Sequence, residues 1–250
     1  MSERLKKYRS MRDFARTPEP SGGAAKKRRL PIFVIQKHHA SRLHYDFRLE
    51  MEGVLKSWAV PKGPSYDPEV KRLAVMTEDH PYDYAAFEGV IPAGNYGAGK
   101  VIIWDNGEWE FIEPGSDPVA ALAAGKLAFR LYGKKMFGEW ALVRIVGRPG
   151  DRGNEWLLVK QRDEFASGEV DVTAVAPRSV VSNRLVDEVG MEPVATKAGA
   201  VSPETSPSKE SDPPEGRPRV APSREASVRT RSSRAGSPQK ARPTRRRRPR

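Results

Sequence analysis

Cysteine is absent from this 250-residue chain. Its absence excludes disulfide bonds, thiolate nucleophiles, and zinc or iron–sulfur sites built on cysteine. Any metal ion must therefore be held by histidine, aspartate or glutamate. Nitrogen and oxygen ligands of this kind suit manganese, iron or exchangeable zinc better than a structural zinc site, although ligand type alone does not choose among them.

Long apolar runs are also missing. No stretch approaches the roughly 18 apolar residues that a membrane span needs, and the opening segment MSERLKKYRSMRDF lacks the apolar core of a signal peptide. We therefore expect a soluble, cytoplasmic protein with no membrane partner. The hydrophobic fraction of 38% is enough for one core, and the sequence shows no repeat of solenoid or propeller period.

Acidic residues are too few to balance the basic ones. Lysine and arginine together number 44 against 32 aspartate and glutamate residues, which gives a formal net charge of +12. Such an excess favours an anionic polymer as the partner, and nucleic acid is the first candidate. We accordingly expect association with the nucleoid.

Composition divides the chain into three parts. Residues 1–30 form a basic N-terminal arm that ends in the turn-rich stretch SGGAAKKRRL. Residues 31–185 carry the strand-like apolar segments and are expected to form one domain. Residues 186–250 are rich in proline, serine and arginine and end in RRRRPR, so we expect a disordered basic tail with too little apolar surface to fold. This tail is either simply solvated or also holds DNA through counterion release.

Short β-rich runs separated by turn-forming residues fill the central part. Their number and regular spacing predict an all-β fold, a single β-barrel domain. One or two helical turns are expected in SDPVAALAAG, with Ser116 or Asp117 as the cap and Pro118 at the first helical position. The stretch Asp105–Gly107 predicts a hairpin turn between strands at 102–104 and 109–111. The runs are PIFVIQ, HYDFRLEME, VLKSWAV, KRLAVMTE, KVIIWDNGEWEFI, KLAFRLYG, EWALVRIVG and EWLLVKQR.

Polar side chains recur with strand periodicity around the histidines, all four of which lie between residues 38 and 80. In a strand HYDFRLEM, the period of two places His44, Asp46 and Arg48 on one face and the apolar residues on the other. Matching parity in neighbouring segments adds Gln36 and His38 to this polar group, and also Arg72, Glu78 and His80. The remaining histidine, His39, has the opposite parity, and we expect it to pack or to face solvent.

This polar face predicts a barrel that encloses a polar, metal-binding cavity rather than a dry core. His44 and Asp46 lie about 7 Å apart along the strand, so both can reach one ion together with His38 from the adjoining loop. Arg48 presents a planar fork that suits phosphate oxygens, and His80 can bind phosphate or give a proton to a leaving oxygen. Lys62 adds a further positive charge.

A long part of the chain resembles the 3′-phosphoesterase domain of bacterial DNA ligase D and its stand-alone relatives. The resemblance begins at YRSMRDFARTPEPSG and is carried mainly by QKHHASRLHYDFRLEMEGVLKSWAVPKGPS and KRLAVMTEDHPYDYAAFEGVIPAGNYGAGKVIIWDNGEW. It continues through GKLAFRLYGKKMFGEWALVRI to WLLVKQRDEFA and covers residues 8 to about 166. Since no polymerase or ligase domain is recognisable in the sequence, we expect the stand-alone form.

The resemblance implies an activity and a set of roles. Members of the family remove a 3′-terminal ribonucleoside to leave a 3′-phosphate and then hydrolyse that phosphate to a 3′-hydroxyl, commonly with Mn²⁺. It implies DNA 3′ ends at primer-templates or double-strand breaks as substrate, and Ku and a DNA ligase as partners. The implied metal ligands are His38, His44 and Asp46, the phosphate contacts Arg48, His80 and Tyr84, the supporting positions Gln36, Arg72 and Glu78, and the N-terminal positions Arg12, Asp13 and Glu19.

Other interpretations of these residues stay open. Tyr84 is equally typical of a core aromatic with a satisfied hydroxyl, and Tyr82 is expected to be structural. The glycines Gly94, Gly97 and Gly99 lack the spacing and the Lys-Ser/Thr ending of a phosphate-binding loop, so a glycine-rich turn or bulge is expected. Two other functions are also compatible with the sequence. One is an iron oxygenase that uses His44, Asp46 and His80 as a two-histidine, one-carboxylate triad, and the other is a non-catalytic module that binds DNA ends.

Overall fold

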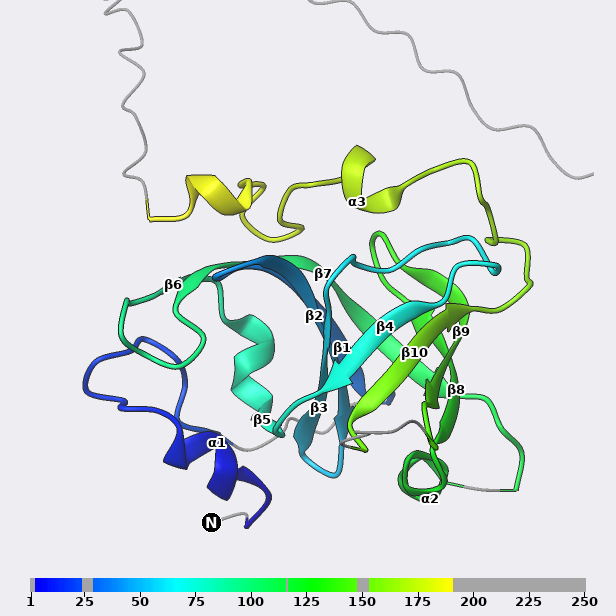
Figure 1. The fold of residues 1–250 in the computed structure, drawn as a ribbon, viewed down its shortest axis with the longest axis horizontal. Coiled ribbons are helices and arrows are strands. Elements are labelled where there is room, and N and C mark those ends of the chain that lie inside the picture. The colour runs from blue at the N-terminus through cyan, green and yellow to red at the C-terminus, as the bar shows by residue number, and fades with distance from the viewer. Residues whose placement is uncertain (1–2, 24–28, 116, 148–152, 191–250) are drawn as a thin grey trace, which may run out of the picture. The chain divides into compact units, whose positions relative to one another are not determined.

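The structure is a computed structural model, and it describes residues 3–23, 29–115, 117–147 and 153–190. Within these ranges the main body is a closed antiparallel barrel of eight strands, in the order β1-β2-β3-β4-β10-β9-β8-β7 (Figure 1). Pairing of β7 with β1 closes the ring. The prediction of an all-β barrel is thus confirmed. The barrel strands are β1 (Ile32–His39), β2 (Leu43–Met51), β3 (Val54–Val60), β4 (Arg72–Met76), β7 (Gly99–Phe111), β8 (Lys126–Tyr132), β9 (Phe137–Arg144) and β10 (Glu155–Lys160).

Apolar side chains fill the barrel interior, and all five tryptophans of the chain are buried there. In β2 the alternation of strand side chains directs Phe47 and Leu49 into this core and Asp46 and Arg48 to the opposite face. The polar cavity that we expected inside the barrel therefore lies on the outer face of β1–β3. Periodicity separates two faces of a strand, but it is the bulk of the large apolar side chains from all the strands that decides which face is enclosed.

β7 is one continuous strand, so the hairpin turn predicted at Asp105–Gly107 is wrong. It pairs with β1 over residues 100–108 and with β8 over residues 108–111, and a bulge opposite Ile35 and Gln36 lies within the stretch that pairs with β1. The carboxylate of Asp105 accepts the backbone N–H groups of residues 134, 135 and 136 in the β8–β9 turn. An Asp-Asn-Gly stretch makes a hairpin only when its flanking strands pair with each other, and here each finds another partner.

Two short strands and several short helices surround the barrel. The predicted helix is confirmed as α2 (Pro118–Ala124), where Asp117 accepts hydrogen bonds from Val119 N and Ala120 N. No helix within the described ranges is long and apolar enough to span a membrane. The remaining elements are η1 (Glu3–Leu5), α1 (Lys6–Ser10), β5 (His80–Pro81), η2 (Tyr82–Ala86), β6 (Gly89–Ile91), α3 (Val172–Val175) and η3 (Val186–Glu188).

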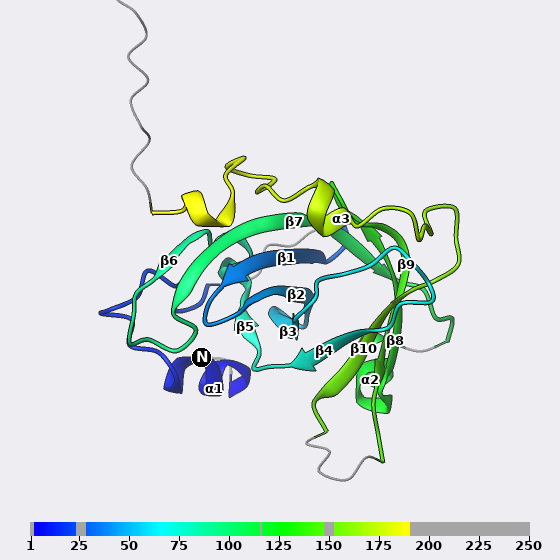
Figure 2. The ribbon, with the colours of Figure 1, turned by 45° about the horizontal axis from the view of Figure 1, so that its top comes forward.

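Both ends of the described chain pack on the barrel. The N-terminal arm buries Tyr8 and Glu19 against the outer face of β1–β3, together with η2. The C-terminal segment from α3 to residue 190 runs along β7, as Figure 2 shows. There Val186 and Val189 pack on Ile102, although the composition places them in the tail. The rest of the predicted tail, residues 191–250, lies outside the described residues.

Candidate metal and phosphate site

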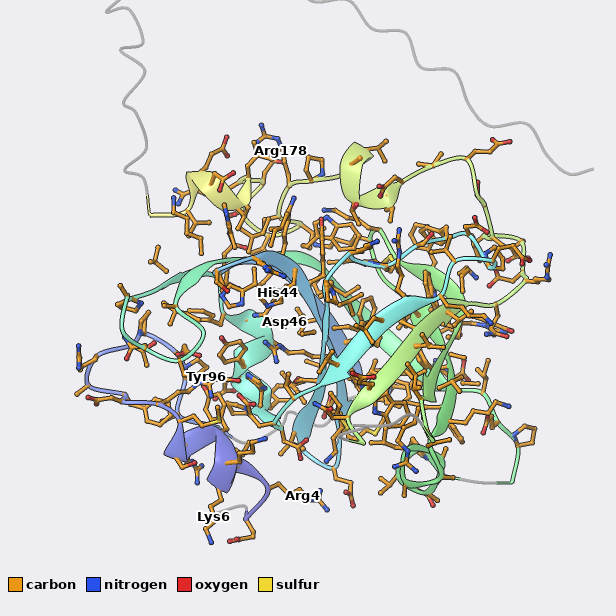
Figure 3. The ribbon with its side chains drawn as sticks, in the orientation of Figure 1. Arg4, Lys6, His44, Asp46, Tyr96 and Arg178 are labelled. Atoms are coloured by element: carbon orange, nitrogen blue, oxygen red, sulfur yellow. The ribbon has the colours of Figure 1, made fainter. Side chains whose placement is uncertain are left out.

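β1 and β2 bring three potential metal ligands together. The antiparallel register pairs His38 with His44 and Gln36 with Asp46, so these side chains share the outer face. One ligand atom from each of His38, His44 and Asp46 lies within 4.8 Å of the others, and Figure 3 shows His44 and Asp46 side by side. His38 is part of β1 and does not reach the group from a loop, as the sequence had led us to expect.

The imidazole nitrogens of this group are arranged for a further partner. His44 donates its Nδ1–H to the carbonyl oxygen of Arg42 at 2.9 Å, which directs Nε2 toward Oδ1 of Asp46, 3.5 Å away. Nε2 of His38 is buried and has no hydrogen-bond partner among the described residues. Burying a nitrogen without a hydrogen-bond partner costs free energy, and a divalent ion would supply the missing contact. The residues present therefore fit a metal ion.

The charge of Asp46 is stabilised from several sides. Burial opposes ionisation, but the guanidinium of Arg48 and the hydrogen bonds from His38 and His44 outweigh it and hold the pKa of Asp46 well below its usual range. For His44, burial lowers the pKa, but the hydrogen bond and charge of Asp46 raise it to a net value above the ordinary one. Asp46 is thus a carboxylate, as a metal ligand must be.

Arg48 is fixed by three neighbours. Its Nε donates to Oε1 of Gln36 at 2.7 Å, its Nη1 to Oγ of Ser57 at 2.9 Å, and its Nη2 to Oδ2 of Asp46 at 3.1 Å. Gln36 is fixed in turn, because its Nε2 donates to the carbonyl oxygens of Tyr84 and Phe87. A guanidinium held this rigidly beside the metal group can bind an anion without first losing conformational freedom.

His80 is buried between two arginines. Burial first, and then the positive charges of Arg48 and Arg12, hold its pKa well below the ordinary value. The hydrogen bonds agree with a neutral ring: Nδ1 lies 2.9 Å from the carbonyl oxygen of Glu78, and Nε2 lies 3.3 Å from Nη2 of Arg12, which can only donate. The carboxylate of Glu78 is 3.9 Å from Nε2, too far to keep the ring protonated.

The N-terminal arm completes the site. Arg12 is 3% exposed at its side chain and forms ion pairs with Glu19 at 2.9 Å and Glu78 at 3.3 Å. Tyr84 donates its hydroxyl to the same carboxylate of Glu19 at 3.0 Å, and burial raises its pKa well above the ordinary value. The arm is therefore part of the site, although composition marks it as a separate basic segment.

Residues 36–144 match the family model of the DNA ligase D 3′-phosphoesterase domain. This part of the chain belongs to that domain family. The multifunctional non-homologous end joining protein LigD of Pseudomonas aeruginosa is 52% identical over 187 residues, which are 73% of this chain and 22% of the relative. The protein of the same name from Mycobacterium bovis is 46% identical over 173 residues, 66% of this chain and 21% of the relative. The chain thus spans about a fifth of the length of these curated relatives.

Four of the residues singled out in the sequence neither line the cavity of this phosphoesterase domain nor hydrogen-bond to a side chain that does. Arg72 shares the parity of the buried core residue Ala74 and lies on the other side of β4. We expected Arg72 to share a strand face with Glu78 and His80. The strand β4 ends at Met76, so its alternation does not extend to those two residues. Asp13 is exposed and accepts the N–H of Ala15 in a turn of the arm, and Lys62 is exposed after β3. His39 lies on the face of β1 opposite to His38, is exposed at the end of the strand, and pairs with Asp187 at 2.8 Å.

Four other residues belong to the site but were missed. Ser57 bonds Arg48, Tyr8 stacks on Arg12 with 3.9 Å between the guanidinium carbon and the ring centroid, and Tyr96 and Gly97 line the cavity. Ser57 pairs with Arg48 in the β2–β3 register and so lies on the same face, and its alternation with the buried Trp58 is a signal in the sequence. Tyr8 and the loop of Tyr96 give no such signal, because only the tertiary fold brings them to β1 and β2.

These groups enclose a cavity of about 270 Å³. Its wall combines the metal group with Arg48, His80 and Arg12, so it has room and charge for a phosphate. A larger hollow of about 480 Å³ lies between η2 and β7, but it holds none of the histidines. The chemistry of the lining therefore selects the smaller cavity as the candidate site of the phosphoesterase domain.

Proposed function

We propose that this chain is a metal-dependent phosphoesterase that processes DNA 3′ ends during repair. It removes 3′-terminal ribonucleosides and hydrolyses 3′-phosphates, and so produces 3′-hydroxyl ends for ligation. The observation that carries this proposal is one cavity that joins the His38, His44 and Asp46 group to the anion-binding side chains Arg48 and His80. Membership of the phosphoesterase family and relatives named for non-homologous end joining support DNA 3′ ends at primer-templates or breaks as the substrate.

The proposed cofactor is a divalent ion, Mn²⁺ by the family resemblance, held by the two histidines and Asp46. When bound, such an ion polarises a phosphoryl oxygen and lowers the pKa of a coordinated water. The proposed partners in repair, Ku and a DNA ligase, rest on the names and family of the relatives alone.

The side chains of this protein have clear tasks in phosphate hydrolysis. Arg48 neutralises the charge that grows on the phosphoryl oxygens, and its three hydrogen bonds keep it in place during the reaction. As water adds to phosphorus, the bond to the 3′-oxygen breaks, and that oxygen takes up a proton. His80 starts neutral between two arginines, and a bound phosphate dianion offsets their charge, so its ring can bind the phosphate or carry that proton.

The same side chains serve the ribonucleoside step. Water again adds to phosphorus, but the bond that breaks is the one to the 5′-oxygen of the terminal ribonucleoside. The ribonucleoside leaves, and the phosphate stays on the 3′-oxygen of the preceding nucleotide. That product then meets the cavity as the substrate of the second step.

The metal group consists of two histidines and one carboxylate, which is also the ligand set of iron oxygenases. An iron oxygenase is therefore the second candidate function. The expected triad changes, because His38 and not His80 completes it. The two arginines in the wall favour a phosphate over a small organic substrate. Turnover that depends on O₂ and a 2-oxo acid would identify an oxygenase instead.

The test is a gel assay of the purified protein on a primer-template whose primer ends in a 3′-phosphate or in one ribonucleotide. We expect conversion to a 3′-hydroxyl end that stops with a chelator and falls at least about 100-fold in His44→Ala, because a ligand is removed. His39→Ala is the matched control, since His39 adjoins His38 in β1 but lies on the opposite face of the strand and pairs with Asp187. If His44→Ala binds DNA normally and wild type converts neither end with any divalent ion, the chain is a DNA-end-binding module.

A further inference from the structure

Tyr96 is an exposed aromatic at the mouth of the cavity. Its side chain is 48% exposed, yet the same residue lines the cavity beside the metal group and Arg12. In Figure 3 Tyr96 lies below and to the left of Asp46 and His44, on the side of the N-terminal arm. The hydroxyl of Tyr96 makes no hydrogen bond within the described ranges, so no polar partner holds the ring in this position.

The loop that carries Tyr96 is built to approach the site closely. Two turns flank it: Asn95 N donates to Pro92 O at 3.2 Å, and Ala98 N donates to Asn95 O at 3.1 Å. Gly97 adopts φ +73°, which favours glycine, and a Cβ there would be in ordinary van der Waals contact with Cε1 of His38, at 3.8 Å. The loop therefore passes beside a candidate metal ligand at Gly97, and the preceding residue, Tyr96, lines the same cavity.

One face of the ring is supported by Arg12. The guanidinium carbon lies 5.5 Å from the ring centroid of Tyr96 and 3.9 Å from that of Tyr8, so Arg12 lies against both rings. Its ion pairs with Glu19 and Glu78 fix Arg12 in turn. A partly exposed ring with a fixed support is a suitable platform for a flat ligand.

We propose that Tyr96 stacks on the base of the nucleotide at the 3′ terminus while the phosphate of that end lies at Arg48 and the metal group. This inference rests on the proposed function and names how that site takes its substrate. Every nucleobase has a π face, so an aromatic platform accepts all four bases. The site therefore processes 3′ ends with little preference for the terminal base.

The test is a cycle that removes the ring, the base, or both. Wild type, Tyr96→Ala and Tyr96→Phe are assayed for kcat/KM on primers with a 3′-phosphate whose last nucleotide carries a base or is abasic. Stacking of one base on an aromatic corresponds to roughly a 5- to 140-fold effect. We expect this loss for Tyr96→Ala on the normal primer and nearly none on the abasic primer, with Tyr96→Phe close to wild type. Tyr132→Ala, an exposed tyrosine on β8, is the matched control.

Equal losses on both primers would overturn the proposal, because they would mean that Tyr96 only supports Arg12. Coupling to the penultimate base alone would also overturn it. A measurement without turnover separates this proposal from the proposed function. The fluorescence of a 2-aminopurine base at the 3′ terminus of the primer is recorded with the protein bound, in the presence of a chelator that prevents hydrolysis. Quenching by wild type and not by Tyr96→Ala supports stacking even if the protein hydrolyses no end, whereas no difference between the two proteins contradicts it.

Discussion

At the scale of single residues, burial and neighbouring charge decide what His80 does. Arg12 from the arm and Arg48 from β2 both face its ring, while Glu78 is its nearest carboxylate at 3.9 Å. Neither arginine adjoins His80 in the sequence. Its neutral state is therefore a property of the folded molecule.

This neutral state predicts a pH dependence of stability. In the unfolded chain His80 takes up a proton below a pKa of about 6.5, whereas in the folded protein its pKa is depressed, so the unfolded state binds more protons and stability falls as pH falls. Between about pH 7.5 and about pH 5.5, wild type should lose up to about 1.4 kcal/mol that His80→Gln does not lose. Urea midpoints of both proteins, measured in chelator at the two pH values, test this. Parallel loss in the two proteins would contradict the burial of a neutral ring.

At the scale of elements, one carboxylate joins a strand to a turn. Asp105 lies within β7, is fully buried, and accepts three backbone N–H groups of the β8–β9 turn. The same residue type at Asp117 accepts two N–H groups at the exposed start of α2. Variants of the two aspartates therefore compare the loss of a buried hydrogen-bond acceptor with the loss of an exposed helix cap.

We expect Asp105→Ala to lower the free energy of unfolding by about 3 kcal/mol or more, because buried N–H groups lose their acceptor. Asp117→Ala should cost only about 1 kcal/mol, because water replaces the cap. Equilibrium urea unfolding with tryptophan fluorescence measures both. Similar costs for the two variants would mean that water reaches the β8–β9 turn as well.

At the scale of the whole molecule, basic charge is unevenly distributed. Most of the excess of lysine and arginine over acidic residues lies beyond residue 190, while the arginines of the site are occupied by ion pairs. Long-range attraction to DNA should therefore come mainly from the tail, and chemistry from the barrel and arm.

Salt dependence tests this division of roles. Substitution of the four arginines at 245–248 by glutamine removes four charges. If all contact phosphates, the slope of log K against log salt for duplex DNA should become shallower by about 3 to 4. Turnover of a 3′-phosphate at saturating DNA should stay unchanged. An unchanged slope in binding titrations would show that the arginine run makes no contact with DNA.

The sequence by itself determined the residue types and their local order. Alternation along β2 separates Asp46 and Arg48 from Phe47 and Leu49, and the spacing of His44 and Asp46 places both on one strand face, because a strand has a period of two. The capped helix at Pro118 follows equally from local rules. These features depend on a few neighbouring residues and are accordingly predictable.

Only the tertiary structure decided where these faces point and what meets them. The apolar side chains of eight strands, counted within the described ranges, took the barrel interior, so the polar face turned outward. That outward face acquired walls from the arm and from the loop of Tyr96, which no periodicity links to β2. Asp105 became an anchor within a continuous strand because its flanking residues found partners far away in sequence. Long-range pairing depends on the packing of the whole chain, and for that reason no local pattern contains it.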